Sequence, residues 1–244
     1  MRKKLMLVMG LLCFMGSTAF AIDFMGPPTA ELKAGQWDVG FVYSTTERDL
    51  EISGFGLKAT GEVETNRYYG NIGYGLSDYL ELGIKLGVAD AEAEGADIGG
   101  LDFAWGFSTK YTFASDETLD WGALFQMSWL NTDDSDTYDL TDYGYGAAES
   151  AKLELDVYEM QIAVGPTFKQ EGWKLYGGPF VYLVDGDLDI TALGGKAGFD
   201  VEEDSAFGGY VGACFDLAEN TNLAIEFAGV SGGWGLGIGI SWEF

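Results

Sequence analysis

Closely spaced carboxylates give the sequence one stretch that could ligate a metal ion. Asp185, Asp187 and Asp189 recur at every second position, and carboxylate oxygens are ligands that calcium prefers. A calcium loop of the EF-hand type needs glycine at its sixth position and glutamate at its twelfth, where this chain has Ile190 and Lys196. The three aspartates are therefore weak calcium candidates, and we predict no metal site.

Histidine is absent from the whole sequence. Its pKa lies near neutrality, so it is the usual general base of hydrolytic enzymes and a common ligand of zinc and haem. The one cysteine beyond the first 21 residues, Cys214, has no second thiol to pair with, and we interpret it as a small filler. The sequence therefore predicts neither an enzyme nor a bound cofactor.

Eight ionisable residues lie on the polar side of segments that alternate between apolar and polar positions. They are Arg67, Glu81, Lys85, Asp102, Lys110, Glu159, Glu226 and Glu243. Successive side chains of a strand point to opposite faces, so these residues are candidates to line the lumen or pore of a closed sheet. Glu81 and Lys110 lie at similar distances from the ends of neighbouring strands, which makes a cross-strand ion pair geometrically plausible.

The alternation is clearest at the C-terminus. Apolar residues stand at every second position over eleven residues, at Trp234, Leu236, Ile238, Ile240, Trp242 and Phe244, with glycine, serine or glutamate between them. A strand of about ten residues with one apolar face matches a tilted membrane-spanning strand.

Nine further segments alternate in the same way. With the C-terminal segment, 234–244, they predict ten strands, near 37–43, 68–75, 80–88, 103–113, 121–129, 158–164, 173–184, 207–216 and 223–227. Short turns near residues 76, 116, 170 and 219 interleave with polar stretches near 45–64, 89–100, 131–152 and 185–204, which we interpret as external loops. Eight or twelve strands are the alternatives.

The N-terminus has the pattern of a secretory signal peptide. A basic start, Met1–Lys4, leads into the apolar run Leu5–Met15, and Ala19-Phe20-Ala21 is a cleavage pattern. An uncleaved anchor is the alternative, but the run is shorter than the roughly 18 residues of a spanning helix. We therefore divide the chain into a signal peptide (1–21), an N-terminal periplasmic segment (22–35) and a barrel (36–244).

The charge of the chain excludes one class of partner. Removal of the leader's three basic residues leaves 10 basic against 39 acidic residues, a net charge of −29. Binding to nucleic acid is not expected, because phosphate recognition depends on lysine and arginine. Acidic residues crowd the predicted external loops, where we interpret them as solvated faces that repel other chains or cells.

The leader, the alternation, the turn pattern and the aromatic last residue Phe244 together resemble the bacterial outer-membrane β-barrel superfamily, specifically small single-chain barrels. The resemblance covers residues 36–244 and implies an all-β, antiparallel up-and-down transmembrane β-barrel in the outer membrane of a Gram-negative bacterium. It also implies contact with outer-membrane lipid and recognition of the C-terminal strand by the barrel-assembly machinery. The enzymes of this superfamily, such as the omptin proteases, use a catalytic histidine, so none of their catalytic residues can be carried over.

Two alternatives to this interpretation concern fold and function. A secreted β-sandwich also alternates, but the glycine, serine and alanine opposite the apolar positions favour a barrel over a water-facing sheet. For function, we expect a small integral outer-membrane protein with a structural or surface-interaction role and acidic external loops. The alternative is a narrow cation-preferring pore, because lumen glycines such as Gly83, Gly235 and Gly237 leave volume unoccupied. Bulky lumen residues, Tyr69, Leu124 and Tyr210, argue against an open path, and any surface partner stays undefined.

Overall fold

The structure is a computed structural model that describes residues 23–54, 57–93, 96–97, 100–139, 148–192, 195–202 and 207–244. The predicted signal peptide, 1–21, lies outside these residues. No helix among them is long and apolar enough to cross a membrane.

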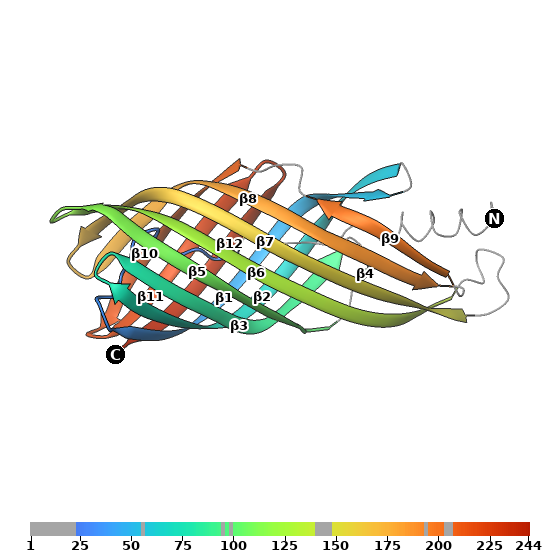
Figure 1. Cartoon of the computed structure of the whole chain (residues 1–244), viewed down its shortest axis with the longest axis horizontal. Helices are drawn as coiled ribbons and strands as arrows, with labels where there is room; N and C mark the ends of the chain where they lie inside the picture. Colours follow the sequence, from blue (N-terminus) through green and yellow to red (C-terminus); the bar gives the residue numbers. More distant parts are fainter. Residues whose placement is uncertain are drawn as a thin grey trace.

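Ten antiparallel strands of 10 to 23 residues form a closed barrel (Figure 1). They are β1 (Trp37–Gly54), β2 (Leu57–Ser77), β3 (Leu80–Ala93), β5 (Asp102–Ser115), β6 (Leu119–Asp139), β7 (Ala148–Gln170), β8 (Trp173–Ala192), β10 (Phe207–Ala218), β11 (Thr221–Val230) and β12 (Gly233–Glu243). Each pairs with its neighbours in sequence order, and the ring closes where β12 pairs with β1. The predicted up-and-down barrel of ten strands is confirmed.

Two shorter strands complete the sheet. β4 (Ala96–Asp97) pairs with the end of β3, and β9 (Gly195–Glu202) pairs with the outer half of β8. β9 also pairs with residues Glu51–Ser53 of β1, so it connects β8 to β1 beyond the ends of the short strands β10, β11 and β12. In Figure 1, β9 lies toward the end of the molecule that is remote from the C-terminus.

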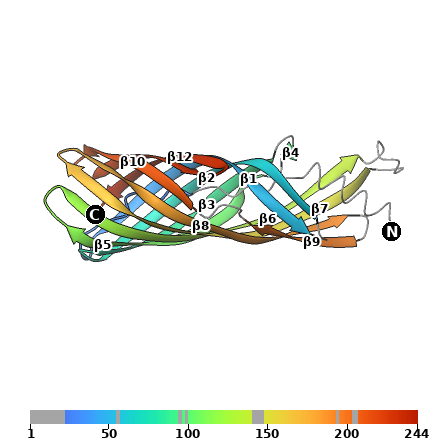
Figure 2. The same ribbon diagram turned by 90° about the horizontal axis from the view of Figure 1, so that it is seen from above.

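Several strands are far longer than a bilayer crossing requires. β1, β2, β6, β7 and β8 contain 18, 21, 21, 23 and 20 residues, whereas a tilted spanning strand needs about 9–11. Their distal parts, which we call the outer extension, project beyond the short strands (Figure 2). Much of the polar sequence that we predicted as external loops is therefore paired strand, including 45–54, 57–64, 131–139, 148–152 and 185–192. Both faces of a strand outside the membrane can be polar, so the ladder continues where the hydrophobic alternation stops.

A belt of exposed apolar side chains surrounds the barrel at the end that holds the C-terminus. Every one of the ten barrel strands contributes to it, through residues such as Phe41, Ile72, Ile84, Phe107, Trp121, Ile162, Leu175, Val211, Phe227 and Ile238. Apolar patches of this extent are not left in contact with water in soluble proteins. The belt therefore fits the hydrocarbon core of a bilayer, with small and polar residues on the inward face.

Short turns connect the strands at the end that holds the C-terminus. In the β5–β6 turn, the N–H groups of Thr118 and Leu119 both donate to Asp116 Oδ1 at 2.8 Å. These bonds favour the ionised form and hold the pKa of the Asp116 carboxyl below its usual range. The aspartate thereby fixes the reversal of the chain, which sets the register of β5 against β6.

The belt predicts a large effect of charge at its centre. Ile238 lies midway along β12 and is 44% exposed, so Ile238→Lys should weaken folding into lipid vesicles by about 2–4 kcal/mol, as for lysine near a bilayer midplane. Urea titration in vesicles measures this cost. The matched control is Asp187→Lys on the exposed face of the outer extension, which should cost little. Equal costs for the two substitutions would show that lipid does not contact Ile238.

Candidate functional site

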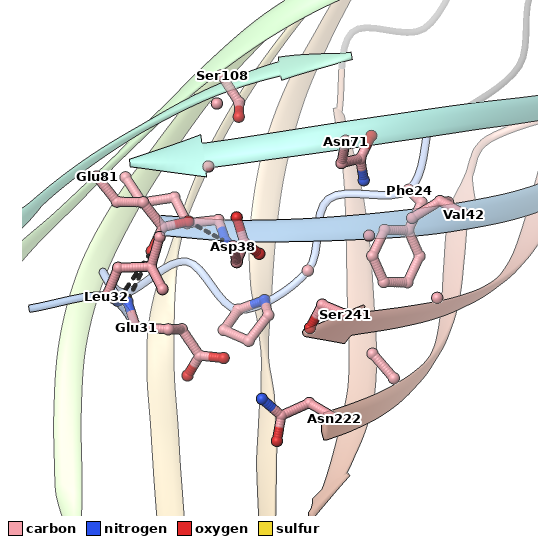
Figure 3. Close-up of a pocket in the computed structure, with 18 of the residues that line it drawn as sticks. Phe24, Glu31, Leu32, Asp38, Val42, Asn71, Glu81, Ser108, Asn222 and Ser241 are labelled. Atoms are coloured by element: carbon pink, nitrogen blue, oxygen red, sulfur yellow. Dashed lines mark hydrogen bonds and ion pairs between the residues drawn. The ribbon is translucent and has the colours of Figure 1, made fainter. Parts of the chain in front are cut away.

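The lumen contains the residues that precede β1. Residues 23–35, which we call the N-terminal plug, run inside the barrel, and Asp23, Met25 and Leu32 are only 2–3% exposed. Figure 3 shows Phe24, Glu31 and Leu32 of the plug among the wall strands. We predicted that residues 22–35 form a periplasmic segment, but in the structure only residues 33–35 of the plug are exposed, at the mouth of the barrel. The plug can lie in the lumen because side chains of the barrel wall accept hydrogen bonds from its backbone N–H groups.

Two wall carboxylates hold the plug by its backbone. Glu226 of β11 accepts the N–H groups of Met25 and Gly26, one on each oxygen, at 2.9 Å. Glu81 of β3 accepts the N–H groups of Glu31 and Leu32 on Oε2, at 2.8 and 3.3 Å. A carboxylate that accepts backbone N–H groups makes strong charge-assisted hydrogen bonds. Glu226 and Glu81 therefore bind the plug near its two ends.

Hydroxyl groups hold the middle of the plug. The Ala30 N–H donates to Thr112 Oγ1 at 2.9 Å, and the hydroxyls of Thr29 and Thr167 lie 2.8 Å apart. Near the mouth, the Ala34 N–H donates to Asp78 Oδ1 at 3.0 Å. The wall therefore supplies acceptors along the whole segment.

Wall lysines hold the plug through charge. Lys85 Nζ of β3 donates to Asp23 Oδ2 at 3.0 Å and to the carbonyl oxygen of Phe24 at 2.7 Å. Lys174 Nζ of β8 lies 2.8 Å from Glu31 Oε1. Each of these plug carboxylates therefore has a cation from the wall, as burial of a charge requires.

Beyond the plug, toward the outer extension, side chains fill the lumen. The Arg67 guanidinium donates to both oxygens of Glu159, with a separation of 3.0 Å from Nη1 to Oε2. Gln126 contacts Gln161 and accepts a hydrogen bond from Lys85. At this depth Arg67, Tyr69, Phe180, Tyr182 and Gln161 are among the largest fully buried side chains, whereas Tyr176 is buried at the level of the plug, opposite Thr167. In the described residues, the interior at this depth is packed rather than open.

The lumen glycines make room for the plug. A Cβ on Gly122 would lie 2.4 Å from the carbonyl oxygen of Pro28, and one on Gly75 would lie 2.1 Å from that of Lys33. A Cβ on Gly237 would lie 2.5 Å from the ring of Phe24. We predicted that lumen glycines leave volume unoccupied, but at these three positions the plug occupies that volume.

The structure brings most of the predicted lumen residues together. Arg67, Glu81, Lys85, Glu159 and Glu226 are buried inside the barrel. The remaining three, Asp102, Lys110 and Glu243, are partly exposed on inward positions of their strands. Glu81 and Lys110 face each other across β3 and β5 and form an ion pair at 2.9 Å, as their register predicts. Glu243 lies at the rim of the barrel, where it accepts a hydrogen bond from Asn222 at 2.8 Å.

The predicted calcium candidates do not form a loop. Asp185, Asp187 and Asp189 lie along β8 on the face opposite the buried Val184 and Gly186. Asp189 instead pairs with Lys196 at 2.9 Å, a hydrogen bond that raises the pKa of Lys196. Within the part of the chain that the structure describes, no group of histidine, cysteine, aspartate or glutamate side chains could hold a metal ion.

Sequence reasoning missed the plug contacts. Thr112 and Gln126 stand on inward positions of alternating segments, so the period of two could have placed them in the lumen. Asp23 and Glu31 lie in a stretch without periodicity, and no sequence signal identifies them. Lys174 opens β8 and makes its contact with Glu31, 143 residues away.

A polar cavity of about 120 Å³ separates part of the plug from β1, β2, β3 and β12 (Figure 3). Asp38, Asn71, Ser108 and Ser241 line it, beside the Glu81–Lys110 pair. The buried Asn71 Oδ1 has no hydrogen-bond partner among the described residues. A cavity of this size with polar lining is large enough for ordered water, which can satisfy such an atom.

Comparisons with known proteins identify the fold class. No protein-family model matches the sequence, and a search of curated proteins finds no relative. Among solved structures, the translocator domain of the autotransporter NalP from Neisseria meningitidis matches with a TM-score of 0.50 at 12% identity, over 88% of this chain and 90% of that chain. The chain has the fold of bacterial outer-membrane β-barrels.

Two further solved structures are similar to this chain. The outer membrane protease OmpT from Escherichia coli has a TM-score of 0.48 at 10% identity, over 91% of this chain and 99% of that chain. An outer membrane channel, COG4313 from Pseudomonas putida F1, has a TM-score of 0.46 at 14% identity, over 93% of this chain and 100% of that chain. At these identities a structural likeness does not define a function.

Because Gly122 contacts the plug, a side chain at this position should destabilise the barrel only when the plug is present. Gly122→Ala should destabilise the full chain by about 1–3 kcal/mol, because the added methyl group overlaps the carbonyl oxygen of Pro28. In a chain that lacks residues 23–34, the same substitution should cost little. Urea titration of the single and combined variants measures the difference. Gly70→Ala is the control, since its Cβ would come no closer than 3.6 Å to a neighbour. An equal cost with and without the plug would contradict the contact.

Loss of one acceptor oxygen at Glu226 should raise the rate of amide hydrogen exchange in the part of the plug that Glu226 binds. In Glu226→Gln an NH₂ group replaces an oxygen and faces a backbone N–H, which costs about 1–3 kcal/mol. Amide hydrogen exchange at Met25 and Gly26 should then speed up by roughly tenfold to a hundredfold. Glu243→Gln at the rim is the control and should leave both amides unchanged. Unaltered exchange in Glu226→Gln would show that this carboxylate does not hold the plug.

Proposed function

We propose that the protein is a small integral outer-membrane protein whose barrel is closed by its own N-terminal plug and whose role is structural or surface-interacting. It is exported with a cleaved leader, and the barrel-assembly machinery reads its C-terminal strand. The observation that carries this proposal is the occupied lumen. At the level of the apolar belt, the plug and the side chains beyond it fill the interior, so the outer extension is the part available to partners.

The surface of the outer extension supports a contact role. The register of β7, β8 and β9 sets Asp156, Asp187 and Asp200 directly opposite one another, and all three are exposed. Like charges opposite each other in a sheet are destabilising. Asn131 donates a hydrogen bond to Asp156, so only one of the three opposed aspartates has its charge stabilised by this contact. An acidic face that destabilises the fold is consistent with a role at the surface, where it stays hydrated and favours cationic partners.

The proposal contains no catalytic step. The sequence has no histidine to serve as a general base. The buried charges of the lumen are engaged with one another or with the plug. Cys214 is a buried free thiol on an inward position of β10.

A second candidate function is a narrow cation-preferring pore with the plug as its gate. The observation that favours it is the way in which the plug is held. Side chains of the wall bind it at separate points, and the polar cavity beside Asp38 already separates it from the wall. With the plug withdrawn, Glu81, Glu226 and Asp38 would give the lumen a preference for cations.

Single-channel conductance in a planar bilayer tests both candidates. We expect the full protein to be silent, because its lumen is occupied, whereas the pore candidate requires that a variant without residues 23–34 give cation-selective steps. In that variant, Glu81→Gln should lower the cation selectivity and Lys110→Gln should raise it, because the two side chains form a lumen ion pair. Heat-dependent gel mobility verifies that each variant is folded.

The outcomes separate the candidates. Steady steps from the full protein would overturn the closed-barrel proposal and favour the pore. Silence of both forms would show that side chains beyond the plug suffice to close the lumen, and the outer extension would remain the functional part. Steps only after removal of the plug would support closure by the plug.

A further inference from the structure

A groove of about 450 Å³ lies in the apolar belt over β8, β10 and β11. Pro179 and Gly209 form its floor, directly opposite each other on β8 and β10. Val211 and Phe227, opposite each other on β10 and β11, form one side and are 51% and 50% exposed. All four residues stand on outward positions of their strands, so the groove opens away from the lumen.

The register of the sheet gives the groove an elongated shape. Gly229 of β11 stands directly opposite Gly209, so one row across three consecutive strands of the sheet lacks long outward side chains, at Pro179, Gly209 and Gly229. Phe207 and Val181, two residues farther along β10 and β8, form a bulkier row on the other side. Neighbouring strands lie about 4.8 Å apart, so the groove is long and narrow.

Packing within the wall does not require glycine on the floor of the groove. A Cβ on Gly209 or on Gly229 would come no closer than 3.9 Å to atoms beyond the chain neighbours. The adjacent Gly208 differs, because a Cβ there would lie 2.3 Å from the ring of Phe180. Glycine weakens a strand relative to residues that have a side chain. The two outward glycines therefore destabilise the wall without improving its packing, and their effect is to keep the groove open.

We propose that this groove is a binding site for one acyl chain of a lipid of the surrounding membrane. The groove lies within the belt, and the belt fits the hydrocarbon core of a bilayer, so hydrocarbon is the material that covers both. A chain in the groove contacts protein atoms at the floor and along both sides, whereas a chain against a flat part of the belt contacts them on one side only. Dispersion attraction grows with the number of such contacts, so the chain in the groove stays bound longer. The inference goes beyond the proposed function and is independent of whether the lumen is open.

A second copy of the chain fits the groove less well than a lipid chain does. In a twofold dimer the same surface patch lies on both sides of the contact. A contact centred on the groove would therefore set one hollow against another, and neither copy would supply a side chain to fill it. A flexible hydrocarbon chain can follow the whole row from Pro179 to Gly229.

Photolabelling locates the bound chain. The full protein is placed in vesicles of phosphatidylethanolamine and phosphatidylglycerol that contain phosphatidylethanolamine with a diazirine at the end of one acyl chain. After irradiation and digestion, mass spectrometry should find several-fold more adduct at Val211 and Phe227 than at Ile84. Ile84 is the reference because it is equally exposed in the belt but has bulky outward neighbours, Ile72 and Phe107, on both adjacent strands. Uniform labelling of all three positions would overturn the inference.

Filling the groove should abolish the preference. In Gly209→Leu the new side chain occupies the floor, so labelling at Val211 and Phe227 should fall to the level of Ile84. Gly70→Leu is the matched control, since Gly70 is also an outward glycine without a close neighbour but stands between Phe41 and Leu86. This control should keep the native labelling pattern. Gly229→Leu fills the other end of the groove and serves as the second variant, and heat-dependent gel mobility verifies that each chain is folded.

The outcomes separate the occupants. Unchanged labelling in folded Gly209→Leu and Gly229→Leu would show that the chain does not bind in the groove. A dimer of the native protein that both substitutions dissociate, while Gly70→Leu does not, would assign the groove to a second copy. Either result overturns the lipid site, while a silent full-length barrel would still support the proposed function.

Discussion

Every backbone N–H and C=O group at membrane depth must find its partner within the protein, and the rest of this structure depends on that constraint. The wall meets it by closing, when β12 pairs with β1. The plug is irregular backbone at the same depth, which is tolerated only inside the lumen. Pro27 and Pro28 bring no N–H group, and the neighbouring donors at residues 25, 26, 30, 31 and 32 find acceptors on Glu226, Thr112 and Glu81.

The same carboxylates explain why the plug and the wall depend on each other. Glu81 is shared between Lys110 and the plug backbone, so it keeps one partner if the plug leaves. Glu226 accepts the N–H groups of Met25 and Gly26 on its two oxygens, so withdrawal of the plug would remove both donors and leave a buried charge to be hydrated. Withdrawal of the plug therefore costs more at Glu226, which loses both backbone donors, than at Glu81, which keeps its ion pair with Lys110. This asymmetry is the physical reason for preferring closure as the resting state.

Period-two alternation was enough to predict the strand number, the outward faces and the register that joins Glu81 to Lys110. The alternation did not identify the strands of the outer extension, which lie outside the membrane, or the plug, which contains no strand. In the outer extension the outward positions are acidic, as at Asp156 and Asp187, and only the inward positions such as Val157 are apolar, so paired strand resembles a polar loop. The plug has neither a period of 2 nor one of 3.6, and its partners lie up to 201 residues away in the chain. Gly237 illustrates the limit, because the sequence cannot distinguish an empty position from one that Phe24 fills.

The outward faces of β7 and β8 change from apolar to acidic along the strand, and this change marks the outer end of the apolar belt. In β8, Leu183 faces outward at 44% exposure, whereas the next residues, Val184 and Asp185, are buried and exposed respectively. In β7 the same change occurs between the outward Tyr158 and the outward Asp156, with Val157 buried between them. Beyond these positions the apolar side chains turn inward.

The buried hydrophobic cluster of the lumen continues into the outer extension. Phe199 of β9 is buried in the same cluster as Val157 and Val184. One strand, β9, closes the wall where three short strands have ended, and fewer strands enclose a narrower interior that side chains can fill. Lipid therefore stabilises one part of the barrel, and an ordinary buried core stabilises the other. A solid extension of this kind can hold opposed aspartates at fixed positions on its surface, which loops could not.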